Sequence, residues 1–307
     1  MDIKDNKKIK KIEDYLQDYK VVSELNNEKT FYHYTSVEGI FGILNNNKIW
    51  ATNMFFLNDV SEFKYTFDLF EQSFLKEIKN EEIKNSLIER FKGYFKALYD
   101  KLPVYVISFS TNEDNLLLWS EFTEKMGYNI GFKIKKLYDT IDSKYKYNNE
   151  VIYDIEEQKR RLKESLESYL EKKNFTSKTN HSDLSFLENL EGDELKKKLD
   201  MLALEMSYIC IVHSIFFKQS IFNQEQEYRI CFLISNENYN KKNIQFRLKE
   251  DVIFPYIEID FDILNSLESI TIGPKNNIDI AKKGLEIYCR NKEIDPKILK
   301  SNIPLRY

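Results

Sequence analysis

Hydrophobic and polar positions along the chain show both the period of two and the period near 3.6, so the sequence predicts strands and helices. Short runs rich in β-branched and aromatic residues are typical of strands, and we predict them at 30–34, 48–52, 103–110, 128–134, 151–155, 227–234, 245–248, 252–259 and 269–273. Apolar residues three and four positions apart indicate helices over about 9–25, 35–44, 63–99 (as two helices), 116–125 and 279–290. The two kinds of element do not alternate regularly, which favours an α+β fold.

The predicted elements form a peripheral helical arm, 1–29, followed by a single α+β domain, 30–307. A charged helical stretch at about 156–217 is interpreted as an insertion into that domain, because no Pro or Gly linker flanks it. The segment 35–38 has the pattern of a capping box. The helix that it opens is expected to end in the Asn run 45–47, since Asn tolerates left-handed geometry.

Composition and charge narrow the class of protein. The chain has 307 residues, of which 42% are hydrophobic and 31% charged, which suits a soluble globular protein with a sizeable core. Its formal net charge of -4 argues against a general nucleic-acid binder, whose affinity depends on Lys and Arg, and leaves open a local basic groove. The N-terminal residues include no apolar run, so we predict a cytoplasmic protein with no signal peptide and no membrane partner.

Residue types that are scarce exclude several kinds of site. With three Cys and three His, no two at ligand spacing, the sequence predicts no metal site. The cysteines are interpreted as reduced thiols of a reducing cytoplasm. The eight Gly residues form neither a dinucleotide-binding fingerprint nor a phosphate-binding loop, which argues against Rossmann and P-loop folds. Aromatic residues reach 14%, so any bound nucleotide would be held by rings, hydroxyls and carboxylates.

The first candidate site is His33, in the predicted strand 30–34. Alternation places its side chain on the face of Phe31 and Thr35, with Tyr32 and Tyr34 on the other face. An imidazole at a strand end, just before a capped helix, can donate to a ribose hydroxyl or support a phosphate. The alternative is a half-buried histidine whose hydrogen bonds are satisfied by the backbone.

The loop 53–62 is a second candidate, since it combines Phe55 and Phe56 with Asn58. It can close over a bound planar group. The alternative is structural, because Asn58, Asp59 and Ser61 are all good N-cap residues for the next helix.

The third candidate is the pair of hydroxyls at Ser108 and Ser110, at the end of a predicted buried strand. Such hydroxyls often cap the following turn. They can also orient an acidic residue on a neighbouring strand.

The fourth candidate is Glu225 with Glu227, directly before an apolar strand. A period of two would place both carboxylates and Arg229 on one face. Two adjacent carboxylates repel, which raises at least one pKa unless a cation such as Arg229 compensates. The alternative is a solvated strand edge that carries charges.

Taken in order, these segments resemble a bacterial protein family that is catalogued as a domain of unknown function. The resemblance covers about 30–307 and rests on these matching motifs: His33-Tyr34-Thr35-Ser36, Ile49-Trp50-Ala51-Thr52, Leu57-Asn58-Asp59, Ser61-Glu62, Ser108-Phe109-Ser110, Leu118-Trp119, Glu225-Gln226-Glu227-Tyr228-Arg229, Ile272-Gly273-Pro274-Lys275 and Ser301 to Arg306.

A more remote similarity is to ADP-ribosyltransferases. The His33-Tyr34-Thr35 strand and its helix look like the first motif of the DNA-targeting toxin branch, Ser108 to Thr111 is similar to a Ser-Thr-Ser strand, and Glu225-x-Glu227 resembles the acidic strand. This resemblance implies a split β-sheet core, near 30–155 and 218–275, with helical insertions. It also implies NAD as the substrate.

The same resemblance assigns roles to single residues. Glu227 would bind the 2′-hydroxyl of the nicotinamide ribose and stabilise an oxocarbenium ion, and Glu225 would position or polarise the acceptor; which of the two is the catalytic carboxylate stays open. His33 would hold the adenosine ribose, and Tyr34, Phe56 or Trp119 would stack on nicotinamide. The remaining residues expected to contact NAD are Thr35, Asn58, Ser108, Ser110 and Arg229.

The leading hypothesis is therefore an NAD-using ADP-ribosyltransferase or NAD glycohydrolase that acts as an effector in toxin action or phage defence. Its acceptor, protein or nucleic acid, stays open. A second hypothesis is a module that senses a nucleotide or phage component without turnover, in which His33 and Trp119 matter for binding. A third is an accessory protein of a defence locus that binds a protein partner through the insertion at 156–217.

Overall fold

The computed structural model describes residues 12–23, 25, 29–57, 62–75, 78–102, 104–123, 126–143, 146–175, 184–234, 244–249 and 251–304. These residues belong to two compact units. The helical unit comprises Met1–Val22, Asp59–Leu102 and Ile152–Ser220, and the sheet unit comprises Ser23–Asn58, Pro103–Val151 and Ile221–Tyr307. That 1–29 is an arm and that 30–307 is one domain with an insertion stay predictions.

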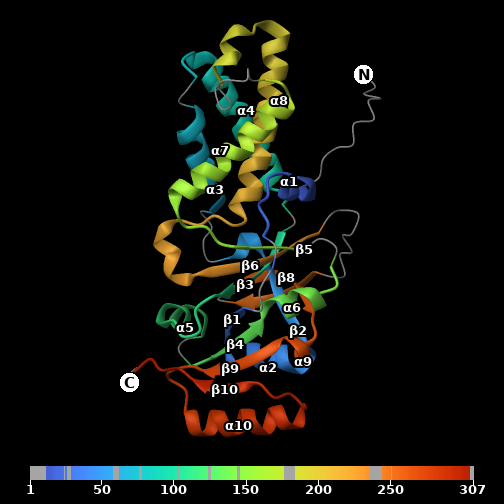
Figure 1. Cartoon of the computed structure of the whole chain (residues 1–307), viewed down its shortest axis with the longest axis vertical. Helices are drawn as coiled ribbons and strands as arrows, with labels where there is room; N and C mark the ends of the chain where they lie inside the picture. Colours follow the sequence, from blue (N-terminus) through green and yellow to red (C-terminus); the bar gives the residue numbers. More distant parts are fainter. Residues whose placement is uncertain are drawn as a thin grey trace. The chain divides into compact units, whose positions relative to one another are not determined.

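In the helical unit, helices pack around one long central helix, α8 (Figure 1). The helices are α1 (Ile12–Asp18), α3 (Glu62–Phe74), α4 (Glu81–Tyr99), α7 (Ile155–Lys172), the short η3 (Leu184–Asn189) and α8 (Gly192–Ser214). Stacked rings fill the contact between α3 and α4, where the centroids of Phe67 and Phe91 lie 4.3 Å apart. The two helices predicted over 63–99 are thereby confirmed.

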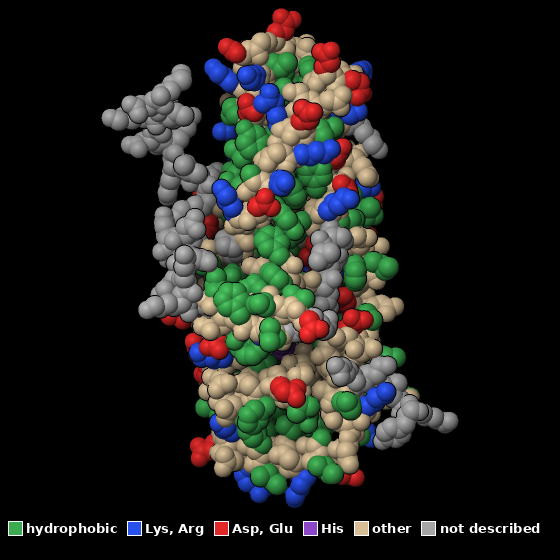
Figure 2. All heavy atoms as spheres, turned by 180° about the vertical axis from the view of Figure 1, so that it is seen from behind, with side chains coloured by type: hydrophobic (Ala, Val, Ile, Leu, Met, Phe, Trp, Pro, Cys, Tyr) green, Lys and Arg blue, Asp and Glu red, His purple; other side chains and the backbone are tan. Residues whose placement is uncertain are grey.

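The outer surface of the helical unit carries charges of both signs. On α7, Arg160 pairs with Glu157 and Glu164, and all three side chains are at least partly exposed. Figure 2 shows Lys and Arg side chains interspersed with Asp and Glu side chains on the face in view. Such mixing differs from the one-sided basic stripe of a nucleic-acid-binding surface.

An open, ten-stranded and mostly antiparallel sheet organises the sheet unit. Its order is β10-β9-β4-β1-β3-β2-β8-β7, and β6 also pairs with β3 and with β5. The strands are β1 (Thr30–Thr35), β2 (Lys48–Asn53), β3 (Val104–Ser110), β4 (Tyr128–Lys133), β5 (Lys146–Glu150), β6 (Glu227–Leu233), β7 (Ile244–Lys249), β8 (Val252–Asp260), β9 (Leu267–Ile272) and β10 (Lys297–Lys300). The predicted α+β class is confirmed.

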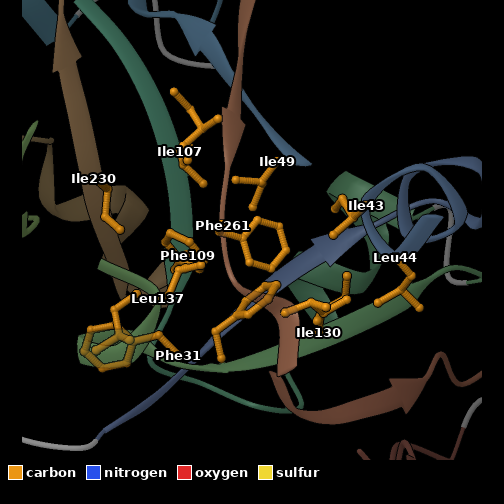
Figure 3. Packing of buried hydrophobic residues seen from close by; sticks show 14 of the residues in the cluster. Phe31, Ile43, Leu44, Ile49, Ile107, Phe109, Ile130, Leu137, Ile230 and Phe261 are labelled. Carbon is orange, nitrogen blue, oxygen red and sulfur yellow. The ribbon is translucent and has the colours of Figure 1, made fainter. Parts of the chain in front are cut away.

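The pleat gives the sheet two different faces. One face is apolar, and Figure 3 shows Ile107 and Phe109 of β3 in one packed cluster with Phe31 of β1 and Ile130 of β4. The helices that pack on it are α2 (Val37–Asn46), α6 (Ile134–Thr140), α9 (Ile263–Ser266) and α10 (Ile278–Asn291). Residues one position along each strand point the other way and form what we call the polar face. Two further elements, η1 (Met54–Phe56) and α5 (Leu116–Thr123), complete the unit, and η4 (Ser220–Glu225) precedes β6.

Three elements of the sheet unit differ from what the sequence predicts. The strand predicted at 151–155 lies earlier, as β5, because hydrogen bonds to β6 hold the polar sequence Lys-Tyr-Asn-Asn-Glu in an extended form. Strand β10 was not predicted, since its four residues gain their place only by pairing with β9. The strand predicted at 128–134 ends at Lys133, and the next residue opens α6.

Candidate functional site

Strands β1 and β2 separate from one another along one edge of β3. Strand β6 pairs with β3 over its whole length, so it fills the opposite edge. On the first edge, β1 pairs with β3 at Ser110, whereas β2 pairs with it at Tyr105 and Val106. The backbone of Ser108 lies between these two points, so neither β1 nor β2 pairs with it on this edge. A partly buried carbonyl that faces this edge needs another donor.

His33 supplies that donor from the end of β1. Its Nδ1 lies 3.0 Å from the carbonyl oxygen of Ser108, and its ring meets the edge of Phe109 at 5.8 Å. Since a carbonyl only accepts, Nδ1 carries the proton and Nε2 is left as an acceptor. Burial lowers the pKa of His33, and the nearby charge of Arg247 lowers it further, against the opposing effect of the bond to Ser108. The neutral imidazole is therefore the favoured form at neutral pH.

The side chain of Ser108 fixes a carboxylate on the neighbouring strand. Its Oγ donates to Oε1 of Glu227 at 2.6 Å. The two oxygens of Glu227 also accept from Nε and a terminal nitrogen of Arg229, each at 2.9 Å. Both side chains are buried, but 8% of the Glu227 side chain is exposed against 1% for Arg229. Ser108 thus connects His33, through its carbonyl, with Glu227, through its hydroxyl.

Glu225 does not lie on the strand that carries Glu227. It ends η4, and the next residue, Gln226, has a left-handed φ of 45° that interrupts the alternation. The carbonyl of Glu225 accepts a hydrogen bond of 2.8 Å from the hydroxyl of Ser110. The prediction that both carboxylates project from one strand face is therefore wrong, because a turn separates them.

Tyr34 and Trp119 stabilise the turn after β3. The Tyr34 hydroxyl donates to the carbonyl of Asn112 at 2.9 Å and accepts from the Asn115 N–H at 3.0 Å. Its ring meets that of Trp119 at 4.9 Å, and the Trp119 indole donates to Asp114 at 2.7 Å. Trp119 is 0% exposed. Its indole therefore has no exposed surface in this structure, and stacking of a bound ring on it stays a prediction.

Thr35 holds the junction between β1 and α2. A Cβ on Gly39 would lie 1.9 Å from the Thr35 hydroxyl, so a larger residue at this position would displace the Thr35 side chain. Ser36 caps α2 by accepting the Gly39 N–H at 3.1 Å, and the helix ends at Asn47, which has a left-handed φ of 52°. The predicted capped helix is confirmed.

The loop 53–62 is described only in part. Its residue Phe56 packs against Phe254 of β8, with ring centroids 5.4 Å apart. Asn58, predicted to contact NAD, lies outside the described residues.

Sequence reasoning missed a cluster around Arg247 of β7. Strand register pairs Arg247 with Phe254, Tyr256 with Thr52, and Thr52 with Val106. Directly opposite residues share a face, so Arg247 belongs to the polar face together with Ser108 and Glu227. The sequence carried one signal, an arginine at alternate positions to Phe246 and Leu248, but it did not show which strands lie beside β7.

Two general features of the described part of the chain concern cofactors and membranes. No group of three or more His, Cys, Asp or Glu residues there is arranged to hold a metal ion. Among the same residues, none of the helices is both long and apolar enough to cross a bilayer.

Residues 118–230 match a family model described as "Protein of unknown function (DUF2971)". The expected resemblance to a domain of unknown function is confirmed over this stretch, which is less than half of the chain. The stretch includes Glu225, Glu227 and Arg229 and leaves His33 and Ser108 outside. Neither a curated protein nor a solved structure matches the chain.

Proposed function

We propose that the sheet unit binds NAD at the point where β1 and β2 separate, has an ADP-ribosyltransferase-like core, and cleaves the bond between nicotinamide and ribose. The ADP-ribose group then passes to water or to an acceptor. The observation that supports this proposal is the connection of His33 and Glu227 through Ser108, at the point where β1 and β2 separate. His33 lies on the face of Phe31 and Ile130, and Glu227 lies on the polar face, so a neutral imidazole and a carboxylate are held in fixed positions on the two sides of Ser108.

Glu227 would stabilise positive charge on the ribose. Loss of nicotinamide leaves an oxocarbenium ion, and a nearby carboxylate lowers the free energy of that transition state, as in glycosidases. Arg229 and Ser108 hold the Glu227 carboxylate in one orientation, so little reorganisation is needed during the reaction. Of the buried pair, Glu227 is the more exposed member and so the one that a substrate hydroxyl can reach.

His33 would bind a ribose hydroxyl as an acceptor. Because Nδ1 donates to Ser108, Nε2 is the nitrogen left for the ligand. This differs from the donor role that the sequence first indicated. Glu225, next to the site along the chain, is proposed to position the acceptor, whether protein or nucleic acid. Depletion of NAD or modification of such an acceptor would give the protein the activity of a toxin or phage-defence effector.

A second candidate function is nucleotide binding without turnover. Both oxygens of Glu227 already accept hydrogen bonds from neighbours, which is also what a purely structural ion pair does. In that case the polar face recognises a nucleotide, and the Glu227 carboxylate has no chemical step to perform.

NAD consumption by the purified full chain tests the proposal. Nicotinamide release is measured for wild type, Glu227→Gln and the matched control Glu225→Gln, with thermal melting to verify folding. We expect Glu227→Gln to lower turnover by about 10²- to 10³-fold and Glu225→Gln to retain hydrolysis. Ser108→Ala keeps the ion pair of Glu227 with Arg229 and removes one hydrogen bond that orients the carboxylate. We therefore expect its turnover to fall by about tenfold. Binding of NAD without any nicotinamide release would establish the second candidate instead, and absence of binding would reject both.

A further inference from the structure

Arg247 holds its guanidinium group among aromatic rings on the polar face. The group lies 5.5 Å from the ring centroid of Trp50 and 6.0 Å from those of Phe254 and Tyr256. One terminal nitrogen donates to the Thr52 hydroxyl at 3.0 Å. Cation–π attraction and this hydrogen bond fix the guanidinium in place.

The same guanidinium has donors that the described residues do not satisfy. Its Nε is buried with no hydrogen-bond partner there, and no described carboxylate lies within ion-pair distance of it. Arg229, in contrast, donates through Nε and a terminal nitrogen to the two carboxylate oxygens of Glu227. A partly buried cation with open donors is costly unless an anion completes it, and the planar fork of arginine fits a phosphate or carboxylate.

An exposed ring beside Arg247 indicates what kind of anion. Trp50 is 41% exposed and lies against Tyr256, with ring centroids 4.3 Å apart. A ligand that uses both features needs a negative group and a flat ring. Nucleotides combine the two, and their bases stack on exposed tryptophan.

We propose that Arg247 binds a phosphoryl group of a nucleotide whose base stacks on Trp50. That this nucleotide is NAD rests on the proposed function. The positive charge of Arg247 contributes to the lowered pKa of His33, so the proposed phosphate site and the imidazole are close enough to interact electrostatically. NAD would then be held at its pyrophosphate by Arg247 and at a ribose by His33.

Tryptophan fluorescence provides a direct assay. The chain has two Trp residues, and Trp119 is fully buried, so quenching by an added nucleotide originates from Trp50. We expect saturable quenching by ADP in the wild-type chain and none in Trp50→Phe. Arg247→Gln should weaken ADP binding by roughly tenfold or more, since it removes a charge-assisted pair. The ADP affinity of Arg247→Lys should lie between those of the wild-type chain and Arg247→Gln, because lysine keeps the positive charge and lacks the planar fork of the guanidinium.

The matched control is Arg290→Gln, which removes an exposed arginine of the same unit and should leave ADP binding unchanged. Melting temperatures verify that each variant is folded, and calorimetry measures ADP affinity where the fluorescence signal is lost. The inference is overturned if the wild-type chain does not bind ADP, or if Arg247→Gln binds it with wild-type affinity. Arg247-dependent ADP binding without NAD cleavage would uphold this inference and reject catalysis. If Arg247→Gln cleaves NAD as fast as the wild-type chain, catalysis is upheld and this inference is rejected.

Discussion

The two faces of the sheet unit bury side chains for different reasons. The apolar face places Ile130 and Phe132 against helices, and such burial stabilises a fold by about 25 cal/mol for each Å² of apolar surface. The polar face buries Glu227 with Arg229, and for such a pair the loss of hydration roughly cancels the Coulomb attraction. Stability therefore explains the first face and not the second, which is why the buried charges of the polar face are assigned to the functional site.

The largest effect on stability is expected from Phe132→Ala. Phe132 is fully buried and meets Phe109 and Phe261 edge to face, with centroids 6.1 and 5.6 Å away. Truncation should lower the free energy of unfolding by roughly 3 to 5 kcal/mol, measured by urea denaturation. Leu264→Ala is the control, since Leu264 is 69% exposed and should change stability by less than about 0.5 kcal/mol. A loss below about 1 kcal/mol for Phe132→Ala would mean that this face is not the core.

Next in size is the effect of breaking the buried pair. Arg229→Met leaves the Glu227 carboxylate buried without its cation, which should destabilise the chain by about 3 kcal/mol, the lower end of the usual range because Ser108 still donates to it. Glu227→Leu combined with Arg229→Met removes both charges. We expect this double variant to be about as stable as wild type in urea denaturation, and inactive. A double variant as unstable as Arg229→Met would show that the pair itself stabilises the fold.

Much of the fold could be predicted because it depends on local sequence. The capped helix α2 follows from Ser36 and the Asn run, and β3 from its β-branched residues. Strand β5 escaped prediction, since its polar residues are extended only through pairing with β6. Strand β10 escaped for the same kind of reason, as its partner β9 lies on another part of the chain.

The candidate site was predictable where one strand decides it. That Ser108 orients an acidic residue on a neighbouring strand was one of two alternatives, and its hydrogen bond to Glu227 confirms it. The placement of Glu225 failed because the left-handed Gln226 cannot be recognised from residue type. Arg247 was missed because its partners come from β2 and β8. The register between strands far apart in the sequence cannot be predicted from the residues of either strand alone.

A smaller effect, with a pH dependence, is expected from His33→Leu. The substitution leaves the Ser108 carbonyl without its donor, which should lower the free energy of unfolding by about 1 to 3 kcal/mol at pH 7. Burial lowers the pKa of His33 below its ordinary value near 6.5, so the stability that this shift contributes is present above pH 6.5 and is lost as pH falls through the lowered pKa.

Urea denaturation at pH 7, 6 and 5 measures this dependence. His33→Leu should lose less stability than wild type between pH 7 and pH 5. Part of the loss remains, because burial also lowers the pKa of His213 in the helical unit, to about 3. Equal losses in wild type and variant would show that His33 does not titrate as a buried imidazole.

The smallest effect on stability is expected from Thr52→Val, which tests the polar face most selectively. The substitution keeps the shape of the side chain and removes the hydrogen bond to Arg247. The free energy of unfolding should therefore fall by about 1 kcal/mol or less. Its effect on ADP affinity should be larger in proportion, about threefold to tenfold, because a guanidinium without that anchor loses orientation. Calorimetry with ADP, beside a urea curve, measures both quantities. If the affinity for ADP is unchanged while the free energy of unfolding falls, Thr52 stabilises the fold and has no role in binding.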